Sequence, residues 1–162
     1  MSNWNFPLKC PTFILFHLAP VPEYDAFIIF SSVDQKFVDE ILLATLEEKH
    51  GFKCCIHYRD FDVGVPFINN MAESVRKSRK TIAVMSHNFF SSQFCSGELD
   101  LALNQSVQKN DNSVVVIIID DFDRKNIPTP LIGRSYIDYT NLKDKETFEA
   151  RLVKCLKTFN NV

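Results

Sequence analysis

The residue best suited to catalysis in this sequence is the glutamate of "CSGEL", Glu98, which falls near the start of an expected helix. A carboxylate at the rim of a pocket can stabilise the oxocarbenium-like charge that develops as a glycosidic bond breaks. A carboxylate in the first turn of a helix is also stabilised by the helix dipole, without any catalytic role. From residue chemistry alone, the helix-dipole interpretation is the stronger of the two.

Nucleophilic catalysis has little support, because a serine or cysteine nucleophile needs a base within hydrogen-bond reach. Cys95 and Ser96 are separated from His87 along the chain, and no G-x-S-x-G sequence is present. Burial beside a helix start is the simpler explanation of Cys95. His57 and His87 both fall at the ends of expected strands, where a neutral, hydrogen-bonded histidine is the simpler expectation.

Phosphate-binding loops and metal sites also lack their usual residues. The four glycines are isolated from one another, which excludes the glycine-rich loops of Rossmann folds and P-loop enzymes. A phospho-accepting receiver domain needs carboxylates at the ends of its first and third strands. Here those ends read "FIIFSS" and "VMSH", and the cysteines and histidines show no zinc-ligand spacing. We therefore expect no metal and no cofactor.

Composition indicates one ordinary globular domain. The chain has 162 residues, of which 46% are hydrophobic and 23% charged. A net charge of −2 argues against nucleic acid or an anionic membrane as the main partner. Five cysteines form an odd set without a C-x-x-C pair, which favours reduced thiols and a cytoplasmic location.

Residues 1–22 form an N-terminal tail in this interpretation, and residues 23–160 form the domain. The apolar run of the tail, residues 13–18, is far too short to span a bilayer. We expect no membrane span within this chain.

Strand-like and helix-like segments alternate along the domain. Runs of apolar residues predict buried strands at 24–30, 53–57, 80–86 and 113–120, with a weaker candidate at 135–139. Such alternation predicts an α/β fold, because parallel strands need helical crossovers. The expected architecture is flavodoxin-like: a five-stranded parallel sheet of order 2-1-3-4-5 with helices on both faces.

Four helices are expected between and after these strands. The first begins near Ser32, where Ser32 and Gln35 suggest a capping box, and ends before Gly51. The second begins at Pro66, the third carries Leu99, Ala102, Leu103 and Val107, and the last begins at about Lys145 and extends to Phe159. The loops at the carboxyl ends of the strands are the expected sites of ligand or partner binding.

Three segments in order resemble the conserved boxes of a TIR domain, the Toll/interleukin-receptor module. They are "YDAFIIFSS" (24–32), "YRDFDVGVPF" (58–67) and "SHNFFSSQFCSGELDLAL" (86–103). The similarity runs from Glu23 to Phe159 and is greatest to the cytoplasmic TIR domains of animal Toll-like receptors and their adaptors. This resemblance implies a non-enzymatic module that associates with other TIR domains and carries innate-immune signals.

In that family the loop after the second strand, the BB loop, is a main contact. The resemblance assigns to it Arg59, Asp60, Phe61, Asp62, Val63 and Gly64. By position, Arg59 and Asp60 would order the loop, Phe61 and Val63 would provide apolar contact, and Gly64 would allow a sharp turn. Val63 stands where the family often has proline, so the loop and its choice of partner are expected to differ from those of typical members.

Some TIR domains cleave NAD with a glutamate at the position of Glu98, and this is the alternative function. NAD would then be a substrate, and Phe30, Ser31 and Phe61 would line its pocket. Active relatives typically carry a basic or glycine-bearing loop after the first strand, where this chain reads "SSVDQK". That departure favours the interaction module over the NAD glycohydrolase.

Overall fold

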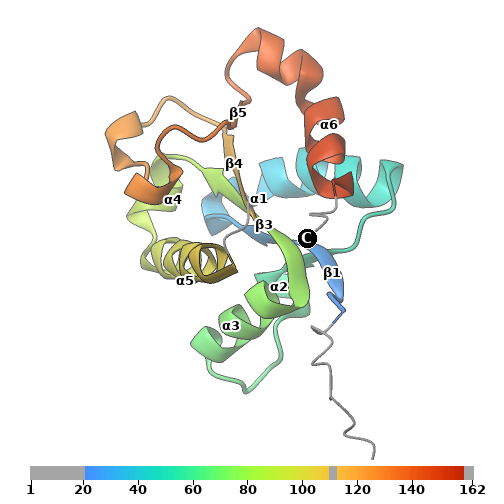
Figure 1. The fold of residues 1–162 in the computed structure, drawn as a ribbon, viewed down its shortest axis with the longest axis vertical. Helices are drawn as coiled ribbons and strands as arrows, with labels where there is room; N and C mark the ends of the chain where they lie inside the picture. Colours follow the sequence, from blue (N-terminus) through green and yellow to red (C-terminus); the bar gives the residue numbers. More distant parts are fainter. Residues whose placement is uncertain (1–20, 110–112, 159–162) are drawn as a thin grey trace, which may run out of the picture.

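A parallel sheet forms the centre of the computed structural model, which describes residues 21–109 and 113–158 (Figure 1). The strands are β1 (Tyr24–Ile29), β2 (Cys54–Ile56), β3 (Ser78–Met85), β4 (Val114–Ile118) and β5 (Ile137–Asp138). The sheet has five strands in the order β2-β1-β3-β4-β5, and every pairing is parallel. Both the fold class and the strand order predicted from the sequence are confirmed.

Helices cover both faces of this sheet, as Figure 1 shows. One face is covered by η2 (Val38–Lys49), a π-helical segment, and α6 (Leu142–Lys157), and the other by α3 (Phe67–Lys77) and α5 (Gln93–Lys109). The shorter segments are η1 (Ser32–Asp34), α1 (Gln35–Phe37), α2 (His57–Asp60), α4 (His87–Ser91), η3 (Arg124–Asn126) and η4 (Thr129–Leu131).

The two hydrophobic cores follow the alternation of side chains along the strands. In β1, Ala26 and Ile28 face η2 and α6, whereas Phe27 and Ile29 face α3 and α5. All four are completely buried. Because both faces of the central strands are covered, these strands consist of continuous apolar runs.

Some helix ends differ from the predictions. The capping box at Ser32 is wrong: Ser32 lies inside η1, and the Asp34 N–H donates to the Ser31 carbonyl at 2.8 Å, so the backbone itself satisfies this turn. The last helix begins at Leu142, earlier than predicted, because Asn141 caps it by accepting a hydrogen bond from the Lys143 N–H. Gly51 ends the first helical segment with φ of +67°, as expected of a residue at that position.

The ends of the chain lie largely outside the described part. The predicted tail over 1–22 is described only for its last two residues, and Phe159 is not described. No helix within the described ranges is long and apolar enough to cross a bilayer.

Candidate functional site

The loop that follows β2, residues 57–67, is here called the BB loop. It begins with α2, turns at Gly64 and ends at Phe67, the first residue of α3. Gly64 has φ of +83°, in the left-handed region that favours glycine, which agrees with its predicted turn. The BB loop leaves the sheet at the carboxyl end of β2, the edge at which ligands and partners were expected.

Asn70, a buried residue of α3 that the sequence analysis missed, holds the backbone of the BB loop. Its side-chain oxygen accepts from the Asp62 N–H at 3.0 Å, and its side-chain nitrogen donates to the carbonyls of Asp62 at 3.0 Å and Val65 at 3.5 Å. The signal available from the sequence was an asparagine beside Met71 on the buried side of an amphipathic helix. Such a residue needs a polar partner.

Arg59 and Asp60 attach the start of the BB loop to the rest of the fold. The Arg59 guanidinium donates to both carboxylate oxygens of Glu47, at 3.0 and 2.9 Å, and to the Cys54 carbonyl at 2.7 Å. Asp60 accepts from the Ile56 N–H at 2.8 Å and also pairs with Arg59. These contacts fit the ordering role that the family resemblance assigned to the two residues.

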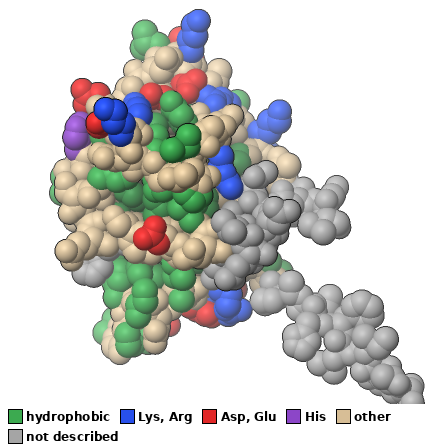
Figure 2. All heavy atoms as spheres, turned by 60° about the vertical axis from the view of Figure 1, so that its left-hand side comes forward, with side chains coloured by type: hydrophobic (Ala, Val, Ile, Leu, Met, Phe, Trp, Pro, Cys, Tyr) green, Lys and Arg blue, Asp and Glu red, His purple; other side chains and the backbone are tan. Residues whose placement is uncertain are grey.

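The two residues of the BB loop that were predicted to provide apolar contact, Phe61 and Val63, face in different directions. Phe61 is half-buried, with its ring 6.1 Å from that of Phe27 and 5.2 Å from that of Phe67. Val63 is fully exposed, and Val65 and Ile68 beside it are also exposed. Figure 2 shows hydrophobic side chains gathered at the lower end of the molecule, where Figure 1 places α3 and the loop before it. We call Val63, Val65 and Ile68 the apolar tip.

A pocket of about 210 Å³ lies between the BB loop and α5. It is lined by Phe30, Ser32, His57, Phe67, Ser92, Cys95 and Glu98. Glu98 is only 2% exposed, and burial raises the pKa of its carboxyl to about 8. Within the described ranges, no residue donates a hydrogen bond to this carboxylate or forms an ion pair with it. Among the residues that the structure describes, the Glu98 carboxyl is therefore largely buried, has no hydrogen-bond or ion-pair partner, and lies beside the cavity.

The structure brings together some of the predicted pocket residues. Phe30 and Glu98 both line the pocket, whereas Ser31 is buried and its neighbour Ser32 takes the lining position. Phe61 is not among the lining residues, but its ring lies 6.3 Å from that of His57 and 5.2 Å from that of Phe67, which both line the pocket. Whether these residues bind NAD stays a prediction.

Two further titratable groups line the same pocket. Burial lowers the pKa of His57, whose ring also packs 5.0 Å from that of Phe30. Burial raises the pKa of the Cys95 thiol to about 11. Both groups are therefore uncharged at neutral pH. Among these three groups, Glu98 is the one whose charge changes near pH 8, where its carboxyl loses a proton.

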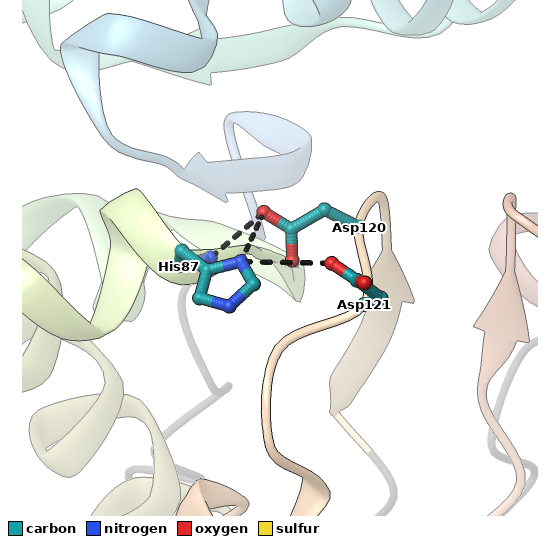
Figure 3. A group of neighbouring side chains, drawn as sticks. All are labelled: His87, Asp120 and Asp121. Atoms are coloured by element: carbon teal, nitrogen blue, oxygen red, sulfur yellow. Dashed lines mark hydrogen bonds and ion pairs between the residues drawn. The ribbon is translucent and has the colours of Figure 1, made fainter.

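A second group of polar residues lies at the ends of β3 and β4, where His87, Asp120 and Asp121 place ligand atoms within 4.8 Å of one another (Figure 3). Asp120 accepts hydrogen bonds from the N–H groups of His87 at 2.9 Å and Phe122 at 3.1 Å. These bonds explain the position of Asp120, and Asp121 is almost fully exposed. We assign no metal to this group, and the absence of a metal site stays a prediction.

Ser86 joins the loop after β1 to the start of α4. Its hydroxyl caps α4 by accepting from the Phe89 N–H at 2.9 Å and donates to Asp34 at 2.5 Å. The Asn88 side chain donates to the same carboxylate at 3.0 Å. These bonds place η1, and with it Ser32, next to the pocket.

Comparison with known proteins identifies relatives over most of this chain. The family model described as "TIR domain" matches residues 26–153. Toll-like receptor 2 of goat (Capra hircus) is 39% identical over 106 residues, which are 65% of this chain and 14% of the receptor. Toll-like receptor 2 of dog (Canis lupus familiaris) is also 39% identical over the same share. The chain thus spans a small part of the length of these receptors.

Solved structures support the same fold. The TIR domain of the Toll-related receptor TRR-2 from Hydra magnipapillata superposes with a TM-score of 0.70 at 24% identity, covering 83% of this chain and 99% of that one. A TIR-STING receptor from C. gigas gives a TM-score of 0.67 at 22% identity, covering 85% of this chain and 41% of that one. At these identities the likeness shows the fold alone.

Proposed function

The chain belongs to the TIR-domain family and is related to the TIR domains of Toll-like receptors, and from this premise we propose that it is a signalling module that binds other TIR domains through its BB loop. The observation that carries the proposal is the fully exposed Val63 at the tip of a loop whose base is held in place. The proposed partners are a second copy of this chain or the TIR domain of a receptor or adaptor. The proposed location is the cytoplasm.

An ordered loop with an exposed apolar tip suits a reversible protein interface. Asn70 and Arg59 hold the loop before any partner arrives, so little conformational entropy is lost on binding. Burial of Val63 and its apolar neighbours then supplies the favourable free energy. Cys54, Cys55, Cys95 and Cys155 form no disulfide among the residues that the structure describes, which is compatible with the proposed cytoplasmic location.

Replacement of Val63 by serine tests this proposal. Burial of a valine is worth about 1.5–3 kcal/mol, so Val63→Ser is expected to weaken association by about 10-fold or more. The measurement is sedimentation velocity of the 162-residue chain alone and mixed with the TIR domain of a Toll-like receptor 2. Val33→Ser is the matched control, because Val33 is a valine that is also exposed, at 72%, but lies on η1.

The structure makes Val63 a better probe than Phe61. Phe61 is half-buried against Phe27 and Phe67, so its removal disturbs packing as well as binding. Val63→Ser changes a side chain that contacts solvent only, and the free energy of unfolding is expected to stay within about 0.5 kcal/mol. Undiminished association of Val63→Ser with every TIR partner tested would reject the BB loop as the binding surface.

NAD hydrolysis at Glu98 is the second candidate function, favoured by one specific observation. Glu98 is a buried carboxyl in a pocket walled by Phe30 and Phe67, and such a group can stabilise positive charge as a glycosidic bond breaks. Because burial raises the pKa of Glu98 to about 8, its carboxyl is mostly neutral at pH 7. Entry of the positively charged nicotinamide ring of NAD would lower this pKa and favour the ionised carboxylate.

Nicotinamide release from NAD by the concentrated or tethered domain tests this candidate. The matched control is Glu146→Ala, a change at an exposed glutamate of α6. Nicotinamide release that disappears in Glu98→Ala and persists in Glu146→Ala would establish that the chain is an NAD glycohydrolase. NAD hydrolysis would be rejected if the wild-type chain released no more nicotinamide than Glu98→Ala under conditions in which the chain is shown to self-associate.

A further inference from the structure

The sheet ends in two edge strands, because β2 and β5 are the outermost strands in the described part of the chain. An edge strand turns the N–H and C=O groups of every second residue away from the sheet. Such a row of groups is a template on which an extended segment of another chain can pair. The side chains that occupy these two rows therefore decide whether the domain can associate by strand addition.

At the β2 edge, the parallel pairing with β1 turns the backbone groups of Cys54 and Ile56 outward. The Arg59 guanidinium donates to the Cys54 carbonyl at 2.7 Å, and the Asp60 carboxylate accepts from the Ile56 N–H at 2.8 Å. Arg59 and Asp60 also form an ion pair with each other at 3.1 Å. The Cys54 N–H donates to Glu47 of η2 at 3.2 Å. Three outward groups of this edge are therefore already bonded to side chains.

The β5 edge is closed in the same way by α6, which lies next to it (Figure 1). Pairing with β4 turns the Tyr136 carbonyl and the Asp138 N–H outward. Arg151 donates to the Tyr136 carbonyl at 2.9 Å, and Asp144 accepts from the Asp138 N–H at 3.0 Å. Arg151 and Asp144 are joined by an ion pair at 2.9 Å. At both edges an arginine thus bonds one outward carbonyl and an aspartate bonds the next outward N–H.

An arginine–aspartate pair in this position reproduces the hydrogen bonds of one residue in an added parallel strand. The N–H of that residue would donate to the carbonyl that the arginine now bonds, and its C=O would accept from the N–H that the aspartate now bonds. The side chains of Arg59 and Arg151 are 41% and 38% exposed, so they also present charge to any strand that approaches. Charged side chains at an edge oppose strand pairing.

We propose that the Arg59–Asp60 and Arg151–Asp144 pairs are edge caps, which prevent a second copy of this chain from extending the sheet. An edge without its cap becomes a docking surface for the same edge of a second copy, in antiparallel pairing about a two-fold axis. Symmetry selects this occupant, because two identical edges related by a two-fold axis present complementary N–H and C=O groups to each other. The proposal does not rest on docking through the BB loop, since the β5 cap lies on α6.

Removal of the β5 cap tests the proposal away from the BB loop. The β5-open variant carries Asp144→Ala and Arg151→Met. Its matched control carries Glu73→Ala and Arg76→Met, which remove an arginine–carboxylate ion pair between exposed side chains of α3. All proteins also carry Val63→Ser, so that association through the apolar tip is weakened equally in each. Undiminished association of Val63→Ser alone would count against the docking function and leave this comparison unaffected.

Sedimentation velocity over a range of concentrations measures self-association. We expect the β5-open variant to dimerise about 10-fold or more tightly than the control, because an antiparallel residue pair exchanges a pair of hydrogen bonds. Hydrogen exchange at the Asp138 amide should be faster than in the control at low concentration and should slow again as dimers form. Association equal to that of the control, or exchange at Asp138 equal to that of the control, would overturn the proposal.

Removal of both caps gives a second readout. With Arg59→Met and Asp60→Ala added, each copy has two open edges, so assembly should pass beyond dimers to longer chains, whereas one open edge should stop at dimers. Large aggregates of the β5-open variant alone would indicate unfolding and would also overturn the proposal. Cooperative urea unfolding checks the fold of each variant. If the variant without both caps does not fold, the β5-open variant and its control decide the question.

Discussion

Replacement of Glu98 by glutamine should make the domain more stable, and the gain should grow with pH. Glu98 is 2% exposed, and its burial raises the pKa from an ordinary value of 4.5 to about 8. Glutamine keeps the shape of the side chain but has no charge to bury. The substitution therefore removes the cost of ionising a carboxyl in an apolar setting.

The sign and size follow from proton linkage. Between about pH 4.5 and about pH 8 the folded state holds a proton on Glu98 that the unfolded state has lost, so the free energy of unfolding falls as pH rises. Each pKa unit corresponds to about 1.36 kcal/mol, which gives a total on the order of 5 kcal/mol above pH 8. That is a large share of the about 5–15 kcal/mol that usually stabilises a domain.

Urea unfolding of the wild-type chain and of Glu98→Gln at several pH values measures this difference. The two proteins should have similar stability at about pH 4.5, and Glu98→Gln should become progressively more stable up to about pH 8. Glu146→Gln, at an exposed position, serves as the control and should follow the wild type. If Glu98→Gln also followed the wild type at every pH, the Glu98 carboxyl would have to be hydrated or paired, and the reasoning about the pocket would fail.

Three other substitutions test how the site is held. Asn70→Ala removes three hydrogen bonds to the BB loop and should lower the free energy of unfolding by about 1–3 kcal/mol. Hydrogen exchange at the Asp62 amide should become faster, and unchanged exchange would contradict the role of Asn70. Gly64→Ala places a Cβ at φ of +83° and should cost about 1–2 kcal/mol in thermal unfolding, whereas no cost would mean that the turn has another conformation. Ser86→Ala removes both the cap of α4 and the hydrogen bond to Asp34, and it should cost at least about 1–2 kcal/mol in urea unfolding. Ser91→Ala, at an exposed position of the same helix, is the control, and equal costs for the two variants would rule out a special role for Ser86.

Local sequence patterns were sufficient to predict the sheet and the four longer helical segments that cover it, but not the short helices α2 and α4. Continuous apolar runs in β1, β3 and β4 indicate strands buried on both faces, and the amphipathic segments between them indicate crossovers. The turn at Gly64 was also predictable, because few other residues adopt a positive φ at low cost. Helix starts were predicted less well, since a backbone carbonyl can replace a side-chain cap, as it does at η1.

Only the tertiary structure decided which residues form the site. The pocket joins residues from four separate segments of the chain, at 30–32, 57, 67 and 92–98, and they meet because parallel strands deliver their loops to one edge of the sheet. The sequence determined that Glu98 is a carboxylate near a helix start, with Phe61 and Val63 in a loop after a strand. Packing of α3 and α5 on the sheet decided that Glu98 is buried and raised its pKa, and that Phe61 faces inward while Val63 faces the solvent.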